Sequence, residues 1–220
     1  MIPLLLILIA IVSYALGTFN GALFLSKHVF HKDIRNHGSG NAGYTNAARV
    51  FGQKGGIAVA VIDVLKSVIA VIFGSLILSI PGDGFPVIGK LFAGFCVMLG
   101  HMYPVQHKFR GGKGVVCLMV TLWLTDWRVG ILATGVFVAV LAMWQFMSLA
   151  SLSACFTGVI TTWIFIESEQ MKGLAGVLVL FSFLIILWRH RGNIIRLMQK
   201  REPKVNWGRQ PESRIRDDKF

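Results

Sequence analysis

Seven long apolar stretches constrain the fold of this chain more than any other feature of its 220 residues. They cover residues 3–25, 55–80, 86–105, 114–126, 129–147, 149–167 and 172–190. A helix needs about 20 apolar residues to cross the hydrocarbon core of a bilayer. Charged residues make up only 15% of the chain, whereas soluble domains carry about a quarter. We predict an all-α, polytopic integral membrane protein with about seven transmembrane helices, of which the fourth is short.

The basic residues between these stretches predict the orientation of the chain. Alternate loops, counted from the first, and the C-terminal tail hold eighteen of the 22 Lys and Arg residues, and the intervening loops hold three. Loops rich in Lys and Arg remain in the cytoplasm, so we predict an external N-terminus and a cytoplasmic C-terminus. Residues 1–200 are expected to form a single helical membrane domain, and residues 201–220 a basic cytoplasmic tail. No Lys or Arg precedes the first stretch, which is therefore expected to be a retained helix rather than a signal peptide.

The net charge of +12 indicates anionic partners. Nucleic acid, anionic lipid and anionic substrates all fit this charge, but the apolar excess favours lipid and substrates, and no nucleic-acid partner is expected. The three cysteines lie inside apolar stretches without a C-x-x-C pair, so the sequence indicates neither a disulfide framework nor a thiolate metal site. The histidines form no metal set with acidic partners, and we expect no metal and no cofactor.

The first polar stretch is H-G-S-G-N-A-G-Y-T-N-A-A-R, residues 37–49. Its glycines, Gly40 among them, allow backbone conformations that direct successive N–H groups toward one point. Neutral donors and a cation accompany them: Ser39, Asn41, Thr45, Asn46 and Arg49. The guanidinium of Arg49 is suited to phosphate. A flexible loop with incidental glycines is the alternative.

The second polar stretch is G-H-M-Y-P-V-Q-H-K-F-R-G-G-K-G-V, residues 100–115. Gly111, Gly112 and Gly114 surround Lys113 directly before an apolar helix. A glycine turn that leads into a helix N-terminus is suited to anions. It lacks the spacing of a P-loop, and a basic flank that only orients the helix is the alternative.

The third polar stretch is R-H-R-G-N-I-I-R-L-M-Q-K-R-E, residues 189–202, at the end of the last apolar stretch. His190 and Asn193 are three residues apart and share a helical face. His190 is a candidate for binding phosphate as an imidazolium or for proton transfer. The neighbouring arginines are suited to anionic lipid head groups.

Polar side chains also occur inside the apolar stretches. Asp63 and Lys66 are three residues apart in the second stretch, and because charges at this depth are costly, we expect them to pair with each other or to face the protein interior. Ser148, at the start of the sixth stretch, is a weaker candidate for the site.

These stretches together resemble the bacterial acyl-phosphate:glycerol-3-phosphate acyltransferase (PlsY) family. The resemblance rests on G-S-G-N-A-G-Y-T-N-A-A-R, D-V-L-K, G-H-M-Y-P-V, F-R-G-G-K-G-V, S-L-A-S and H-R-G-N-I-I-R-L, in this order over most of the chain. The chain departs from the usual family pattern at Tyr44, Val116, Cys117 and Gln145. The candidate donors are unaffected, so activity is still expected.

The resemblance implies a multi-pass enzyme of the bacterial cytoplasmic (inner) membrane whose site faces the cytoplasm. It would transfer a fatty acyl group from acyl phosphate to the sn-1 hydroxyl of glycerol 3-phosphate, giving lysophosphatidate and phosphate, the first step of phospholipid synthesis. Membrane lipid and the enzyme that makes acyl phosphate are the implied partners.

The residue types suit this reaction, because both substrates carry a phosphate and acyl phosphate already has a good leaving group. We expect positioning and charge stabilisation rather than covalent catalysis. Residues expected to hold acyl phosphate are Ser39, Thr45, His190, Asn193 and the glycine amides of the first stretch. Arg49, Lys113 and the amides of residues 111–114 are expected to hold glycerol 3-phosphate. The hydroxyl proton passes either to a phosphate oxygen or to His190 as general base.

Two other classes of protein share some of these features. A transporter of small organic phosphates would also have basic loops, but it should carry polar residues through the depth of several helices. A membrane scaffold with a lipid-binding tail would tolerate replacement of Ser39, Arg49 and Lys113.

Overall fold

The structure is a computed structural model that describes residues 1–81, 85–166 and 169–205. No strand occurs within these ranges, so the predicted all-α class is confirmed. The helices are α1 (Ile2–Thr18), α2 (Gly21–His28), η1 (Ile34–Asn36), α3 (Tyr44–Ser79), α4 (Pro86–Met102), η2 (Val105–His107), α5 (Val115–Thr125), α6 (Trp127–Trp144), α7 (Met147–Phe165), α8 (Glu169–Arg189) and α9 (Arg191–Met198).

Six helices within the described ranges are long and apolar enough to cross a membrane. The seventh apolar helix is α5, which has only 11 residues and is too short for a full crossing. Six of the seven predicted stretches therefore correspond to helices long enough to cross, the fourth is short as expected, and the exact number of spans stays a prediction. A two-residue turn at Gln145 and Phe146 separates α6 from α7, with Gln145 in the left-handed region at φ 61°.

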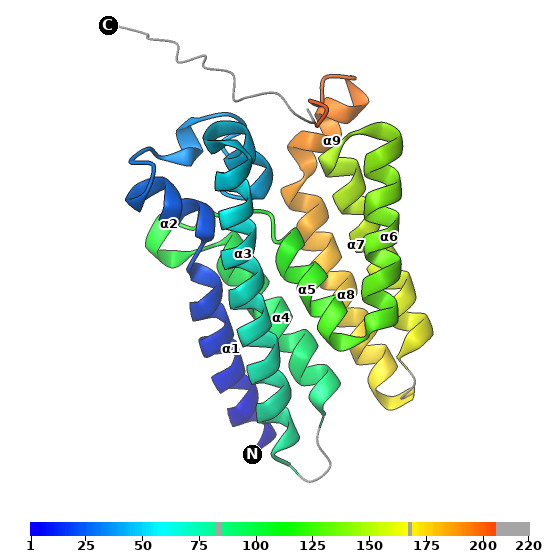
Figure 1. Cartoon of the computed structure of the whole chain (residues 1–220). Helices are drawn as coiled ribbons and strands as arrows, with labels where there is room; N and C mark the ends of the chain where they lie inside the picture. The colour runs from blue at the N-terminus through cyan, green and yellow to red at the C-terminus, as the bar shows by residue number, and fades with distance from the viewer. Residues whose placement is uncertain (82–84, 167–168, 206–220) are drawn as a thin grey trace, which may run out of the picture.

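The helices form an elongated bundle in which α4 is central (Figure 1). It packs against α1 and α3 on one side and against α5 and α8 on the other. Small residues allow these backbones to approach closely: a Cβ added to Gly17 of α1 would lie 2.2 Å from the carbonyl oxygen of Val97, and one added to Gly89 of α4 would lie 2.1 Å from that of Gly74. Close contact through glycine is characteristic of helix packing in membranes, where apolar burial gives little drive for association.

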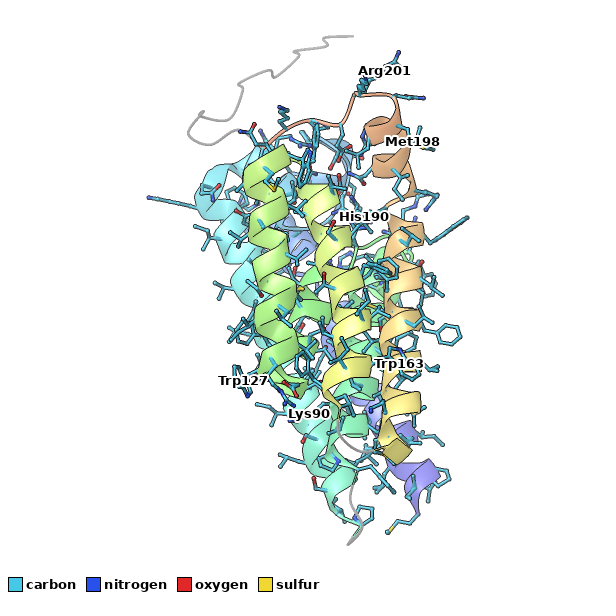
Figure 2. The ribbon with its side chains drawn as sticks, turned by 90° about the vertical axis from the view of Figure 1, so that its right-hand side faces the viewer. Lys90, Trp127, Trp163, His190, Met198 and Arg201 are labelled. Atoms are coloured by element: carbon cyan, nitrogen blue, oxygen red, sulfur yellow. The ribbon has the colours of Figure 1, made fainter. Side chains whose placement is uncertain are left out.

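The polar stretches gather at one end of the bundle. In Figure 1 the segment between α2 and α3 lies at the same end as α9, and α5 begins partway down the bundle. His190, Met198 and Arg201 lie toward this end in Figure 2, whereas Lys90 and Trp127 lie toward the other. The part of the second polar stretch that connects η2 to α5 is therefore recessed below this end. Which side of a membrane this end faces stays a prediction.

The first polar stretch is only partly a loop. Tyr44 to Phe51 form a short helix that Gly52 separates from the rest of α3, with φ 78° and ψ 173° at Gly52. The short helix folds back on the long one, since a Cβ added to Gly56 would lie 2.7 Å from the Cβ of Ala48. Thr45, Asn46 and Arg49 therefore sit on a helix rather than in the glycine loop that we expected.

Residues 201–205, the start of the predicted tail, contact the turn between α6 and α7. The N–H of Val205 donates to the carbonyl of Gln145 at 2.8 Å, and the ammonium of Lys204 lies 5.9 Å from the centre of the Phe146 ring. The remainder of the predicted tail, residues 206–220, lies outside the described residues.

Candidate active site

The loop of the first polar stretch uses its amides internally. Ser39 N–H donates to Asn46 Oδ1 at 2.8 Å, and Gly40 N–H donates to the carbonyl of His37 at 3.0 Å. Asn46 is completely buried, and its Nδ2 donates to the carbonyls of Ile34 and His37. This contradicts the expectation that the amide of Gly40 is free for substrate. Asn46 shapes the loop, since its amide group is already fully engaged.

Several side chains of the first stretch remain available. Ser39 and Arg49 are exposed and Asn41 and Thr45 are half-buried. Within the described residues, none of these four side chains has a hydrogen-bond partner in the protein. The short helix at the start of α3 also has no side-chain cap, because its N-cap residue is Gly43. The free hydroxyls and the uncapped helix N-terminus make this part of the first polar stretch suited to an anion.

The second polar stretch also departs from expectation. The N–H groups of Gly111 and Gly112 donate to the carbonyls of Met102 and His101 at 3.0 and 3.1 Å, so these two amides are not free to hold a phosphate. The guanidinium of Arg189 binds the carbonyls of both glycines at 3.0 and 2.9 Å. Gly114 has φ 79° and precedes α5, which has no side-chain cap. The free N–H groups of this stretch are therefore at the N-terminus of α5.

Lys113 is part of a hydrogen-bonded cluster that joins three segments. Its ammonium donates to Asn193 Oδ1, and Asn193 Nδ2 donates to Glu202 Oε1 at 2.6 Å. Ser148 Oγ donates to the same carboxylate oxygen at 2.7 Å, and Arg196 Nε donates to Glu202 Oε2 at 2.8 Å. The predicted residues Lys113, Ser148 and Asn193 therefore meet around Glu202. Glu202 is the last residue of the third polar stretch, and the sequence analysis did not place it in the site.

The electrostatics of this cluster are dominated by positive charge. Burial lowers the pKa of Lys113 to about 8, with further lowering from the cations of Arg196, Arg189 and Arg49, while Glu202 opposes the shift. Burial works to raise the pKa of Glu202, but hydrogen bonds from Asn193, Ser148 and Arg196 outweigh it and hold the pKa below its usual range. Lys113 and the three arginines whose charges act on it thus outnumber the one carboxylate, an imbalance that a phosphate dianion would offset.

His190 is neutral in this structure at physiological pH. It is 2% exposed, and burial together with the ammonium of Lys113 lowers its pKa to about 4. Nδ1 lies 2.8 Å from the carbonyl of Ile186, so Nδ1 carries the ring proton and Nε2 is the acceptor. Burial thus disfavours the imidazolium form that the sequence analysis considered for phosphate binding.

The first and second stretches are held side by side. A Cβ added to Gly112 would lie 2.7 Å from the carbonyl oxygen of Ala42, and Arg35 Nη1 donates to the carbonyl of His107 at 3.2 Å. The charge of Arg49 also acts on Lys113. Within the part of the chain that the structure describes, no hydrogen bond joins the side chain of Ser39 or Thr45 to the cluster around Lys113. Arg189, which fixes the glycine turn, was missed by sequence reasoning because its position resembles an ordinary basic flank.

Fold and site together define a polytopic membrane protein with a recessed cationic site at one end of its bundle. A family model described as glycerol-3-phosphate acyltransferase matches residues 7–200. The chain is 37% identical to a glycerol-3-phosphate acyltransferase of Thermoanaerobacter pseudethanolicus, over 90% of this chain and 95% of the relative. It is 39% identical to one of Geobacillus kaustophilus, over 91% and 96%.

Solved structures agree with the sequence relatives. The chain superimposes on the crystal structure of PlsY (YgiH), an integral membrane glycerol 3-phosphate acyltransferase, in its glycerol 3-phosphate form with a TM-score of 0.81. The identity is 28%, and the match covers 91% of this chain and 96% of that chain. The lysophosphatidic acid form of PlsY matches with a TM-score of 0.78 at 27% identity, over 91% of this chain and 95% of that chain. This chain therefore belongs to the glycerol-3-phosphate acyltransferase family, and it is a membrane acyltransferase.

Proposed function

We propose that this acyltransferase moves a fatty acyl group from acyl phosphate to the sn-1 hydroxyl of glycerol 3-phosphate. The hydroxyl oxygen attacks the acyl carbonyl carbon, the bond from that carbon to the phosphate oxygen breaks, and inorganic phosphate leaves. The products are lysophosphatidate and phosphate. The observation that carries the proposal is Lys113 together with the three arginines whose charges act on it, Arg196, Arg189 and Arg49, next to apolar helices that can accommodate an acyl chain.

We assign glycerol 3-phosphate to Lys113 and Arg49. The charge of Arg49 acts on Lys113, so the two cations are close enough to share one phosphate. The ammonium of Lys113 is also desolvated, which strengthens its attraction for a phosphate dianion. Gly111 and Gly112 support this site because they have no side chain, which lets the turn before Lys113 pack against His101. Their amides are not available to the substrate. The uncapped N-terminus of α5 after Gly114 adds free N–H groups at the same place.

We assign the phosphate of the acyl donor to the hydroxyls of Ser39 and Thr45 and the amide of Asn193, while the acceptor nitrogen of His190 is left for the attacking hydroxyl. The hydroxyls of Ser39 and Thr45 have no partner among the described residues, so they can donate to phosphate oxygens. The amide of Asn41 makes no hydrogen bond to any residue that the structure describes, so it can also donate to a phosphate oxygen. Gly40 and Asn46 contribute by shaping the loop.

The proton of the attacking hydroxyl passes to a phosphate oxygen of the substrates. A general base works best when its pKa lies near the operating pH. The second pKa of a phosphate ester is about 6, whereas burial brings the pKa of His190 to about 4. His190 is thus a weaker base than the substrate itself, and we expect its neutral Nε2 to orient the attacking hydroxyl.

The donor is tested by offering palmitoyl phosphate, palmitoyl-CoA and palmitoyl carrier protein separately to the purified chain with glycerol 3-phosphate. Lysophosphatidate is expected from palmitoyl phosphate alone. Formation from palmitoyl-CoA at an equal rate would refute the proposed donor. Flux of glycerol 3-phosphate through proteoliposomes without product would favour a transporter instead.

We further propose that the site faces the cytoplasm of a bacterial inner membrane, where an enzyme that makes acyl phosphate is its partner. The excess of Lys and Arg on alternate loops supports this orientation. Cysteine substitutions at Arg201 and Lys90 give a test, since the two residues lie toward opposite ends in Figure 2. The native cysteines are buried and give a low background. A membrane-impermeant thiol reagent on intact spheroplasts should label Lys90→Cys and spare Arg201→Cys.

A further inference from the structure

A buried polar cluster lies between the two glycine-rich stretches and takes no part in the proposed reaction. Its members are Asn20, Asp63, Lys66 and His101, with exposed fractions of 1%, 2%, 4% and 4%. They come from the N-cap of α2, from α3 and from the end of α4. The predicted pairing of Asp63 with Lys66 is confirmed, since the ammonium lies 2.8 Å from Asp63 Oδ1.

Lys66 connects this cluster to the end of α1. Its ammonium donates to the carbonyls of Gly17 and Phe19 at 3.2 and 3.1 Å, and it lies 2.9 Å from His101 Nδ1. Asp63 Oδ1 lies 3.4 Å from the same ring nitrogen, so both members of the ion pair contact His101 Nδ1. The contact at Nδ1 thus fixes the orientation of the imidazole ring.

Asn20 connects the cluster to the first glycine-rich stretch. Its Oδ1 caps α2 by accepting the N–H of Leu23 at 3.0 Å, which directs Nδ2 away from that helix. Nδ2 donates to the carbonyl of Ala42 at 3.2 Å and lies 3.3 Å from His101 Nδ1. One side chain therefore holds both the start of α2 and the loop that carries Ser39.

His101 connects the cluster to the second glycine-rich stretch. Its carbonyl accepts the N–H of Gly112 at 3.1 Å. Its Nε2 lies against the same glycine, because a Cβ added to Gly112 would be 2.0 Å from Nε2. Gly112 is held between this ring and the carbonyl of Ala42, directly before Lys113. The cluster therefore sets the spacing between the two stretches.

A charged cluster is an expensive way to fill this space. Burying an ion pair costs several kcal/mol per ion before the pair's attraction is counted, and charges inside a membrane protein are characteristic of functional positions. Apolar packing would stabilise the helices as well, but it has no directionality. The hydrogen bonds of Lys66 and Asn20 hold backbone carbonyls from separate segments at defined positions, which a site built on loops requires.

We propose that Asn20, Asp63, Lys66 and His101 are positioning residues that hold Gly112 and Ala42 at the spacing in which Lys113 and the first stretch bind one molecule of glycerol 3-phosphate. The inference deepens the proposed function and rests on its assignment of that substrate to Lys113. None of the four residues is expected to touch the substrate. Their loss should therefore weaken binding of glycerol 3-phosphate more than it lowers stability.

Two variants of the full-length, detergent-solubilised protein test this inference. Asn20→Ser retains a good helix cap and removes the donor to Ala42. His101→Asn retains an acceptor for Lys66 and removes the ring from Gly112. Asp126→Ser is the matched control, because Asp126 caps α6 through the N–H of Arg128, away from the polar stretches. The readouts are the Kd for glycerol 3-phosphate by calorimetry, the KM for palmitoyl phosphate and the Tm.

Both variants are expected to weaken glycerol 3-phosphate binding about tenfold or more, the effect of one lost hydrogen bond or its equivalent in misplacement. The KM for palmitoyl phosphate should also rise in Asn20→Ser, because Asn20 holds the loop that carries Ser39. The affinity of Asp126→Ser for glycerol 3-phosphate should change little. A Kd within about twofold of wild type, with a lower Tm, would assign the cluster a merely structural role and overturn the inference.

If either variant does not fold, the paired replacement of Asp63→Leu with Lys66→Met decides, since an apolar pair often preserves stability where a single removal does not. A folded paired variant with wild-type affinity for glycerol 3-phosphate overturns the inference, and weakened affinity supports it. Failure of the proposed donor would appear separately, as binding of glycerol 3-phosphate without transfer from palmitoyl phosphate.

Discussion

The lowered pKa of Lys113 predicts a specific pH dependence of substrate use. With a pKa of about 8, the ammonium is about 90% protonated at pH 7 and about 10% protonated at pH 9. The shift is downward from 10.5, so the positive charge is lost as pH rises through 8 rather than through the usual range. Glycerol 3-phosphate stays a dianion over this interval, because its second pKa is about 6. The kcat/KM for glycerol 3-phosphate should therefore fall about tenfold between pH 7 and pH 9.

Two substitutions isolate this effect. Lys113→Arg keeps its charge at every accessible pH, so its kcat/KM should be lower than wild type but nearly flat between pH 7 and pH 9. Lys113→Ala should lose about 2–4 kcal/mol of binding for the phosphate, seen mainly as a higher KM for glycerol 3-phosphate. Steady-state assays with saturating palmitoyl phosphate measure both variants. An identical decline above pH 8 in wild type and Lys113→Arg would refute the assignment, because the titrating group would then lie elsewhere.

Four further substitutions follow from the site. His190→Gln should leave the shape of the pH–rate profile between pH 6 and 8 unchanged while lowering kcat, because a group with a pKa of about 4 does not titrate in that range; loss of a limb in this range would restore His190 as the base. Glu202→Gln should lower the Tm, since Arg196 loses its ion pair at 2.8 Å. It should also raise the KM for glycerol 3-phosphate, since the negative charge that favours the protonated form of Lys113 is removed. An unchanged Tm by calorimetry and an unchanged KM would remove Glu202 from the site. Gly112→Ala should abolish activity, since the added methyl group would lie 2.0 Å from His101 Nε2 and 2.7 Å from the carbonyl oxygen of Ala42; an active alanine variant would contradict the described packing. Ser39→Ala should lower turnover with an unchanged Tm, and wild-type kinetics would exclude its hydroxyl from the site.

Much of the fold could be predicted because a membrane helix is recognised from a local property. The length of an apolar stretch decides whether it can cross a bilayer, and the short stretch at 114–126 was identified as the exception that α5 proved to be. The pairing of Asp63 with Lys66 was equally accessible, because an unpaired charge at that depth is too costly. The gathering of the polar stretches at one end followed from the alternation of basic loops.

The chemistry of the glycine-rich stretches was predicted less well. Glycine patterns identify backbone that can bend, but they do not show which N–H groups stay free. The amides of Gly40, Gly111 and Gly112 find carbonyl partners, and for the last two these partners lie on α4. The neutral state of His190 likewise depends on burial next to Lys113, about eighty residues away in the chain.

The amino-acid sequence by itself determined the membrane class, the helices and the family, since these depend on apolar length and on motifs read along the chain. Only the tertiary structure decided that Glu202 accepts hydrogen bonds from Ser148, Asn193 and Arg196. It also decided that Asn20 and His101 hold the two glycine-rich stretches together. The physical reason is that a hydrogen bond or a shifted pKa depends on which distant atoms share a water-poor space, and no local pattern specifies that neighbourhood.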